Sequence, residues 1–84
     1  MTVRNQELAN TLGQVLHDLR IEKKFSQERL AELSGYDRAY VSEVERARKA
    51  VSVEALRAFL LALDEAPASF FDRIEDVWGI NDHI

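Results

Sequence analysis

Residues 27–45, QERLAELSGYDRAYVSEVE, constrain the fold more than any other part of the sequence. Ser26 precedes this stretch and is a good N-cap, because its hydroxyl can accept a hydrogen bond from a free backbone N–H of the first helical turn. Gly35 lies in the middle, where a residue that tolerates positive φ can end a helix at no steric cost. Asp37 follows as a second N-cap candidate. The stretch therefore predicts two short helices joined by a tight turn.

The apolar residues of this stretch indicate that the two helices cross closely. Ala31 and Leu33 are expected to face inward, and Ala31 is small enough to lie beneath a second helix. Val41 and Val44 recur at helical spacing and can anchor that second helix from behind. With Gly35 in the turn, this spacing is typical of a helix-turn-helix unit, whose helices meet at roughly 90–120° and whose second helix can lie in the DNA major groove. A plain hairpin of two helices inside a bundle is the alternative.

Length and composition limit the rest of the molecule. We expect residues 1–84 to form one domain, because the chain is long enough for a single core and too short for a separate ligand-binding domain of ordinary size. Three Gly, one Pro and no strand-like alternation predict an all-α fold. The absence of cysteine excludes disulfides, thiolate metal sites and cysteine nucleophiles. No apolar run approaches membrane-spanning length and no N-terminal signal pattern is present, so we expect a cytoplasmic protein without membrane contact.

The net charge of −4 at first argues against a polyanion as partner. The distribution of the charge along the sequence changes that conclusion. Residues 20–57 contain nine Lys or Arg and seven Asp or Glu, a local balance of +2. From Asp64 to the end, six acidic residues accompany a single Arg, so the tail is the acidic part. Non-specific affinity for DNA follows the number of phosphates neutralised, and it should therefore be modest here. Specific contacts would therefore have to contribute more to the affinity for DNA.

Apolar residues also recur at helical spacing before residues 27–45, in a first helix that reaches about Lys23. Its apolar stripe comprises Leu8, Leu12, Val15, Leu16 and Leu19. Gly13 lies within the stripe, and we interpret it as a tolerated residue rather than a site of close helix approach. Residues 1–6 have no apolar period and are predicted to form a loosely ordered arm.

Two more helices are predicted after residues 27–45. Ser52 is a good N-cap for a helix that ends near Asp64, and Pro67 favours the start of a fifth helix over residues 67–78. Gly79 is expected to end that helix, with residues 81–84 as a frayed end.

The fifth helix carries more apolar surface than a terminal helix needs to cover a small core, and such surplus usually marks an interface. We expect it to form a homodimer contact, with either Phe70 or Phe71 directed into the core. The residues assigned to the dimer contact are Phe71, Ile74, Val77 and Trp78. The alternative is that Phe70, Phe71 and Ile74 all close the core of the monomer.

Over residues 12–63, the chain resembles the Cro/C1-type helix-turn-helix family, the phage-repressor-like DNA-binding domains. The residues that carry this resemblance are Ser26-Gln27, Leu30-Ala31, Gly35, Val41, Ser42, Val44, Glu45, Arg46 and Ala62-Leu63. The segment DRAYVS, residues 37–42, looks most like the controller proteins of restriction–modification systems, small stand-alone members that dimerise and bind palindromic operators. The resemblance implies a compact five-helix, lambda-repressor-like domain with the helix-turn-helix at its second and third helices.

The resemblance also implies roles for individual residues. Arg20 and Glu45 correspond to positions that form a structural ion pair, and each charge would be costly if buried alone. The recognition helix would run over about residues 38–46, where side chains can reach base edges. The residues implied to contact bases are Arg38, Ala39 and Ser42. Those implied to contact the DNA backbone are Gln27, Tyr40, Arg46, Arg48 and Lys49.

Two positions are harder to assign. Glu43 can accept a hydrogen bond from a cytosine amine or orient Arg38 or Arg46, and we favour the orienting role because an unpaired acid in the groove repels phosphate. Ala47 stands where Gly often follows the Glu-Arg pair of the family, which leaves open the course of the loop that carries Arg48 and Lys49.

These observations predict a sequence-specific transcriptional regulator that binds double-stranded DNA as a homodimer on a palindromic operator. An enzyme is not expected, because no Gly-rich phosphate loop or metal-ligand spacing is present and His17 is more simply a solvated residue. We expect no cofactor, metal or small-molecule ligand. An antitoxin or a protein-interaction module with the same fold is the alternative, which the acidic tail and the apolar fifth helix leave open.

Overall fold

The computed structural model describes the backbone of residues 2–78 and the side chains of residues 6–77. Five helices follow one another in this range, namely α1 (Thr2–Glu22), α2 (Gln27–Ser34), α3 (Arg38–Glu45), α4 (Val53–Ala62) and α5 (Pro67–Trp78). No strand occurs among the described residues, and none of their helices is long and apolar enough to cross a membrane. The predicted all-α, five-helix fold is confirmed.

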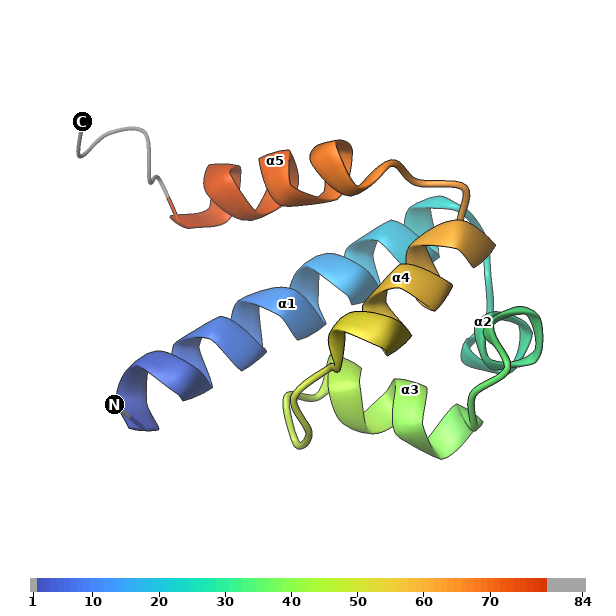
Figure 1. The fold of residues 1–84 in the computed structure, drawn as a ribbon, viewed down its shortest axis with the longest axis horizontal. Coiled ribbons are helices and arrows are strands. Elements are labelled where there is room, and N and C mark those ends of the chain that lie inside the picture. Colours follow the sequence, from blue (N-terminus) through green and yellow to red (C-terminus); the bar gives the residue numbers. More distant parts are fainter. Residues whose placement is uncertain (1, 79–84) are drawn as a thin grey trace.

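The long helix α1 connects the two sides of the molecule. It contacts α3 on one side and α5 on the other, while α2 packs against both α3 and α4. Figure 1 shows α5 lying along α1, with the α2–α3 pair on the side of α1 away from α5. A partner that contacts α5 would therefore leave α3 accessible.

The helix boundaries follow local signals in the sequence. Ser26 and Ser52 each accept a hydrogen bond from the backbone N–H three residues further on, at 2.9 and 3.0 Å, as predicted for N-caps. Gly35 ends α2 with a φ of 82°, the left-handed conformation that favours glycine. Asp37 does precede α3, but its side chain makes no capping hydrogen bond.

The start of α1 differs from the prediction. The helix begins at Thr2, so the expected loose arm over residues 1–6 is wrong for the part that the structure describes. No Gly or Pro breaks these residues. The side-chain Nε2 of Gln6 donates to Asn10 Oδ1 at 2.9 Å and to the Ala47 carbonyl oxygen at 3.4 Å. A segment without an apolar period can thus be helical.

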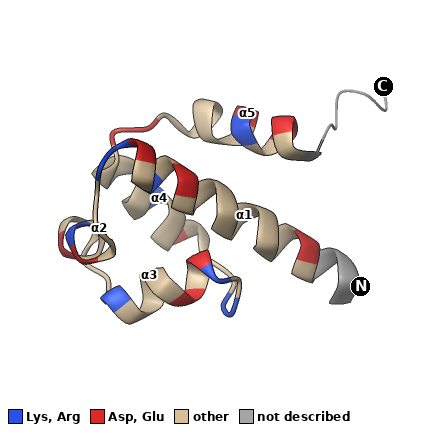
Figure 2. Cartoon of the chain, turned by 180° about the vertical axis from the view of Figure 1, so that it is seen from behind, with Lys and Arg blue, Asp and Glu red and all other residues tan. Residues whose placement is uncertain are grey.

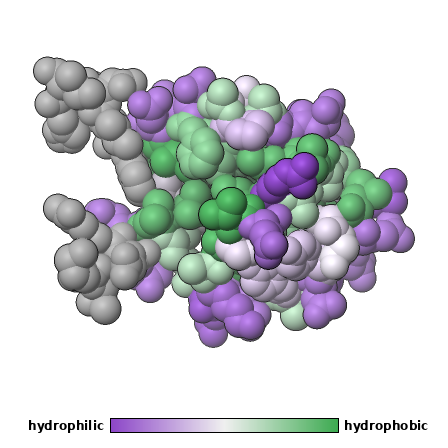
Figure 3. Space-filling model, in the orientation of Figure 1, coloured by the Kyte–Doolittle hydropathy of each residue, from purple (hydrophilic) through white to green (hydrophobic). Residues whose placement is uncertain are grey.

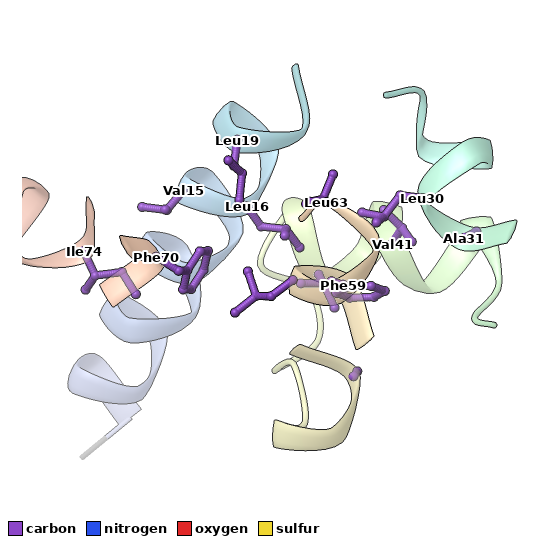
Figure 4. Close-up of a cluster of buried hydrophobic side chains, with 13 residues drawn as sticks. Val15, Leu16, Leu19, Leu30, Ala31, Val41, Phe59, Leu63, Phe70 and Ile74 are labelled. Atoms are coloured by element: carbon purple, nitrogen blue, oxygen red, sulfur yellow. The ribbon is translucent and has the colours of Figure 1, made fainter. Parts of the chain in front are cut away.

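All five helices contribute side chains to one core. The buried apolar residues are Val15, Leu16, Leu19, Leu30, Ala31, Val41, Val44, Ala55, Phe59, Leu60, Leu63, Phe70 and Ile74. In Figure 4, Phe70 and Ile74 lie at one end of this cluster and Leu30 and Val41 at the other. Burying each large apolar side chain contributes about 1.5–3 kcal/mol. Leu33, which was expected to face inward, is 46% exposed because it lies off the buried stripe of α2.

Gly13 lies where α1 and α3 approach each other closely. A Cβ atom at this position would lie 2.4 Å from the Val44 carbonyl oxygen and 2.9 Å from that of Glu45. Real Cβ atoms essentially never come within 3.0 Å of another heavy atom, so any side chain here would displace the end of α3. The interpretation of Gly13 as a merely tolerated residue is therefore wrong.

Candidate nucleic-acid interface

The outer face of α3 is polar and begins with exposed side chains. Arg38 and Ala39, at the start of the helix, are exposed, and Ser42, four residues after Arg38, is half-buried. On the opposite face, Val41 and Val44 are 0% and 2% exposed and anchor the helix in the core. The structure therefore holds α3 from behind and presents the residues predicted to contact bases.

Basic residues lie at both ends of α3. Figure 2 shows Lys and Arg at the start of the helix and in the loop that follows it. Arg46, Arg48 and Lys49, all exposed, belong to this loop region. Glu43 pairs with Lys49, whose Nζ lies 3.5 Å from Glu43 Oε1, so the expectation that Glu43 orients Arg38 or Arg46 is wrong.

The loop after α3 keeps a left-handed turn despite its lack of glycine. Ala47 adopts a φ of 60°, the conformation that glycine provides most easily. The backbone N–H groups of Arg48 and Lys49 then donate to the Glu43 carbonyl oxygen at 2.8 and 3.3 Å. These bonds define the course of the loop that the sequence left open.

Arg20 and Glu45 form the ion pair that the resemblance implied. Arg20 Nε donates to Glu45 Oε2 at 2.6 Å, and Arg20 Nη2 donates to Glu45 Oε1 at 3.0 Å. The two side chains are only 7% and 3% exposed. Arg20 Nη1 also donates to the Phe25 carbonyl oxygen at 2.7 Å. One guanidinium thus joins α1 to the end of α3 and to the turn before α2.

The surroundings of Glu45 favour its charged form. Burial raises the pKa of the Glu45 carboxyl, but the hydrogen bonds from Arg20, Gln27 and His17 lower it by more, so that the pKa lies below its ordinary value. Glu45 is therefore ionised at neutral pH and balances the charge of the buried Arg20.

Gln27 connects this ion pair to the start of α3. Its Nε2 donates to Glu45 Oε1 at 3.1 Å, and its Oε1 accepts from Arg38 Nη1 at 3.4 Å. A side-chain amide nitrogen carries two hydrogens, so one remains for a further acceptor. Gln27 is also the first residue of α2, where backbone N–H groups have no partner within the helix.

His17 belongs to the same network, which the sequence analysis missed. Its Nδ1 lies 3.1 Å from Glu45 Oε1 and 3.4 Å from Arg20 Nη2. The side chain is 43% exposed, so solvation describes only part of its environment. The signal that was available is its position one helical turn before Arg20, on the same face of α1.

Tyr40 points toward α4. Its ring stacks on that of Tyr36, with centroids 5.4 Å apart, and lies 6.1 Å from the ring of Phe59. Its hydroxyl oxygen accepts a hydrogen bond from the Ser52 backbone N–H at 3.3 Å. A hydroxyl that accepts one bond can still donate its own hydrogen, so the contact of Tyr40 with the DNA backbone stays a prediction.

The residues assigned to a dimer contact fall into two groups. Phe71 and Val77 are 50% and 60% exposed, whereas Ile74 is 5% exposed and belongs to the core. The assignment of Ile74 is therefore corrected, because the rotation of α5 turns it toward α1 together with Phe70. The side chain of Trp78 lies outside the described residues, as do Gly79 and residues 81–84.

An apolar groove lies beside Phe71, and no pattern in the sequence predicted it. Two hollows of about 330 and 440 Å³ share Val53, Leu56 and Phe71 in their walls. Val53 is 84% exposed, and Leu61 and Leu8, one in each hollow, are 65% and 42% exposed. Figure 3 shows hydrophobic residues gathered on this face of the molecule. We call the surface of Leu8, Val53, Leu61 and Phe71 the apolar groove.

Comparison with a family model identifies the family of this chain. A model described as a helix-turn-helix domain matches residues 11–69. The chain belongs to this family. A search of the curated proteins finds no match to this helix-turn-helix chain.

Solved structures similar to this helix-turn-helix protein are restriction–modification controller proteins. C.AhdI from Aeromonas hydrophila is 44% identical, with a TM-score of 0.71 over 74% of this chain and 94% of its own. A point mutant of the controller C.Esp1396I is 30% identical, with a TM-score of 0.80 over 82% of this chain and 92% of its own. The C.Esp1396I tetramer in complex with its natural 35 base-pair operator is 29% identical, with a TM-score of 0.78 over 82% and 91% of the two chains.

These comparisons give the protein its general function. It is a helix-turn-helix, DNA-binding transcriptional regulator that resembles the restriction–modification controller proteins, and it is not an enzyme. In the described part of the chain, no three His, Cys, Asp or Glu residues are grouped to hold a metal ion.

Proposed function

We propose that this protein acts as a homodimer on a palindromic operator, with α3 of each protomer in the major groove. The observation that carries the proposal is the way in which α3 is held against the rest of the molecule. A bidentate ion pair with both side chains buried holds its end, and Arg38 is exposed at its start. The operator complex of C.Esp1396I, a similar protein, supports the same use of the fold.

We further propose that specificity comes from the first turns of α3. An arginine can donate two hydrogen bonds to the O6 and N7 of guanine, which suits the exposed Arg38, and a methyl group can contact the thymine methyl, which suits Ala39. Ser42 follows on the same face. The residues proposed to contact the DNA backbone are Gln27, Tyr40, Arg46, Arg48 and Lys49.

The proposed dimer uses α5 and the apolar groove. Phe71, Val77 and Trp78 were assigned to it from the sequence, and the exposure of Val53 and Leu61 in the adjoining groove supports a larger contact. A stable dimer buries about 800 Å² on each partner, so the proposed contact includes the apolar groove as well as α5. Two recognition helices about 34 Å apart would then enter successive major grooves.

Selection of bound sequences from random duplexes tests the DNA part of this proposal. The expected result is a palindromic consensus whose affinity falls with salt by a modest slope, because few phosphates are neutralised by an acidic chain. If no duplex binds better than bulk DNA, the proposal fails. The alternative of an antitoxin or protein-interaction module would then replace it.

Sedimentation of variants tests the dimer. Phe71→Ala, Val53→Ala and Trp78→Ala are each expected to shift the protein toward monomer. Ile21→Ala is the matched control, because Ile21 is 54% exposed on α1 and lines neither hollow of the groove. Unchanged sedimentation of all three groove and α5 variants would refute the proposed surface.

A further inference from the structure

Arg73 joins three separate segments of the chain. It is the one Lys or Arg of the sequence after Arg57. Its Nη1 and Nη2 donate to Glu22 Oε1 and Oε2 at 3.2 and 3.0 Å, at the end of α1. Its Nε donates to Glu65 Oε2 at 3.0 Å, in the connection between α4 and α5. The guanidinium therefore ties α5 to both of the segments beside which it lies.

This cluster joins an exposed carboxylate, that of Glu22 at 56%, and a nearly buried one through a single guanidinium. The pair with Glu22 is bidentate, which adds geometric specificity to the attraction of the charges. The side chain of Glu65 is 9% exposed and that of Arg73 is 34% exposed. The hydrogen bond and the charge of Arg73 lower the pKa of Glu22, and hydrogen bonds to Glu22 and Glu65 raise the pKa of Arg73.

The position of Arg73 on α5 determines what the cluster can control. At 3.6 residues per turn, Phe70 and Ile74 lie on the face toward the core. Arg73 lies on one flank of that face and Phe71 on the other. Holding Arg73 in place therefore opposes rotation of α5 about its own axis. It also determines the direction in which Phe71 faces.

The same end of α1 also holds the recognition helix. Glu22, the partner of Arg73, lies two residues after Arg20, the partner of Glu45. Two arginine–carboxylate contacts at the end of one helix thus link α5 to α3. Figure 2 shows the acidic and basic residues of α5 and of this end of α1 on neighbouring ribbons.

We propose that Arg73 is a positioning residue that sets the half-site spacing which the dimer accepts on DNA. The inference rests on the dimer contact proposed above. Figure 1 shows α5 and α3 on opposite sides of α1, across the 25 Å extent of the molecule. With a lever of about 20 Å between these two helices, a rotation of about 10° at α5 moves α3 by about 3.4 Å, one base-pair step. The rigidity of the α5–α1 contact therefore governs spacing, while Arg38 and its neighbours govern base sequence.

The test compares the wild type with Arg73→Gln, which disrupts the contacts with both Glu22 and Glu65, and with Glu22→Gln, which weakens the contact with Glu22 alone. Glu7→Gln is the matched control, because Glu7 is an exposed glutamate near the other end of α1. Each protein is measured by fluorescence anisotropy on its selected palindrome and on duplexes with one base pair added to or removed from the centre. Sedimentation gives the dimer constant, and circular dichroism verifies folding.

The wild type and the control should prefer one spacing. Arg73→Gln should lose this preference by about threefold to tenfold and Glu22→Gln by less, because the bond from Arg73 to Glu65 remains, while the preferred half-site sequence stays the same. Full spacing preference in a folded, dimeric Arg73→Gln protein would overturn the inference and leave the proposed function intact. A wild type that stays monomeric on DNA, or binds all spacings equally, would overturn both.

Discussion

Substitution of Gly13 by alanine separates helix propensity from tertiary packing. Alanine in a helix interior is favoured over glycine by about 1 kcal/mol, so sequence reasoning alone predicts a stabilised protein. The new Cβ atom would lie 2.4 Å from the Val44 carbonyl oxygen, below the 3.0 Å limit of real Cβ contacts. That oxygen belongs to the backbone and cannot move by rotation of a side chain.

The net effect of Gly13→Ala is therefore a loss of stability. Moving α3 away from α1 by a few tenths of an ångström or more costs about 1–3 kcal/mol, as in other overpacked cores. We expect the upper part of this range, because a second oxygen, that of Glu45, would lie at 2.9 Å. After subtraction of the gain in propensity, the free energy of unfolding should fall by about 2 kcal/mol.

Urea unfolding and DNA binding measure this prediction together. Because the displaced atoms lie at the end of α3, operator affinity should fall along with stability. Gln14→Ala is a matched control at the exposed neighbouring position of α1, and it should change the free energy of unfolding by no more than about 0.5 kcal/mol. A Gly13→Ala protein that is as stable as the wild type, with unchanged operator affinity, would show that α1 and α3 do not pack closely at Gly13.

Further predictions concern the contacts behind α3. Glu45→Gln should lower the free energy of unfolding by about 3 kcal/mol in urea titrations, since it leaves Arg20 buried without a countercharge. The pKa of Glu45 lies below its ordinary 4.5, so the stabilisation by this carboxylate is complete above about pH 4.5 and is lost as the pH falls through the lowered pKa. Unfolding curves between about pH 7 and pH 3 should show this loss of stability in the wild type and less of it in Glu45→Gln. Tyr40→Phe should cost about 1 kcal/mol, because the Ser52 N–H loses its acceptor, and an unchanged urea midpoint would show that this bond contributes nothing.

The helices and their caps were predictable because their signals are local. Ser26, Gly35 and Ser52 act on backbone groups within three or four residues of themselves, so their roles can be recognised in the sequence. The ion pair of Arg20 and Glu45 was predicted by resemblance alone. Nothing in the spacing of two charges 25 positions apart requires them to meet.

The features that the sequence did not predict depend on how helices pack. Gly13 looks like any tolerated glycine until the end of α3 is found above it. Ile74 and Phe71 are both apolar residues of α5, and the rotation of that helix buries the first and exposes the second. His17 and Tyr40 acquired partners on other helices, which no local pattern specifies.

Recognition of a DNA base by Arg38 at the start of α3 can be measured as a change in base preference at one position. The affinities of the wild type, Arg38→Ala and Arg46→Ala are measured on the selected operator and on duplexes with each single base-pair change. Arg38→Ala should cost about 1–3 kcal/mol on the operator and abolish discrimination at one base pair. Arg46→Ala should weaken binding to all duplexes about equally, as a backbone contact does. If Arg38→Ala instead loses affinity equally for every duplex and keeps all base preferences, Arg38 contacts the DNA backbone and does not recognise a base.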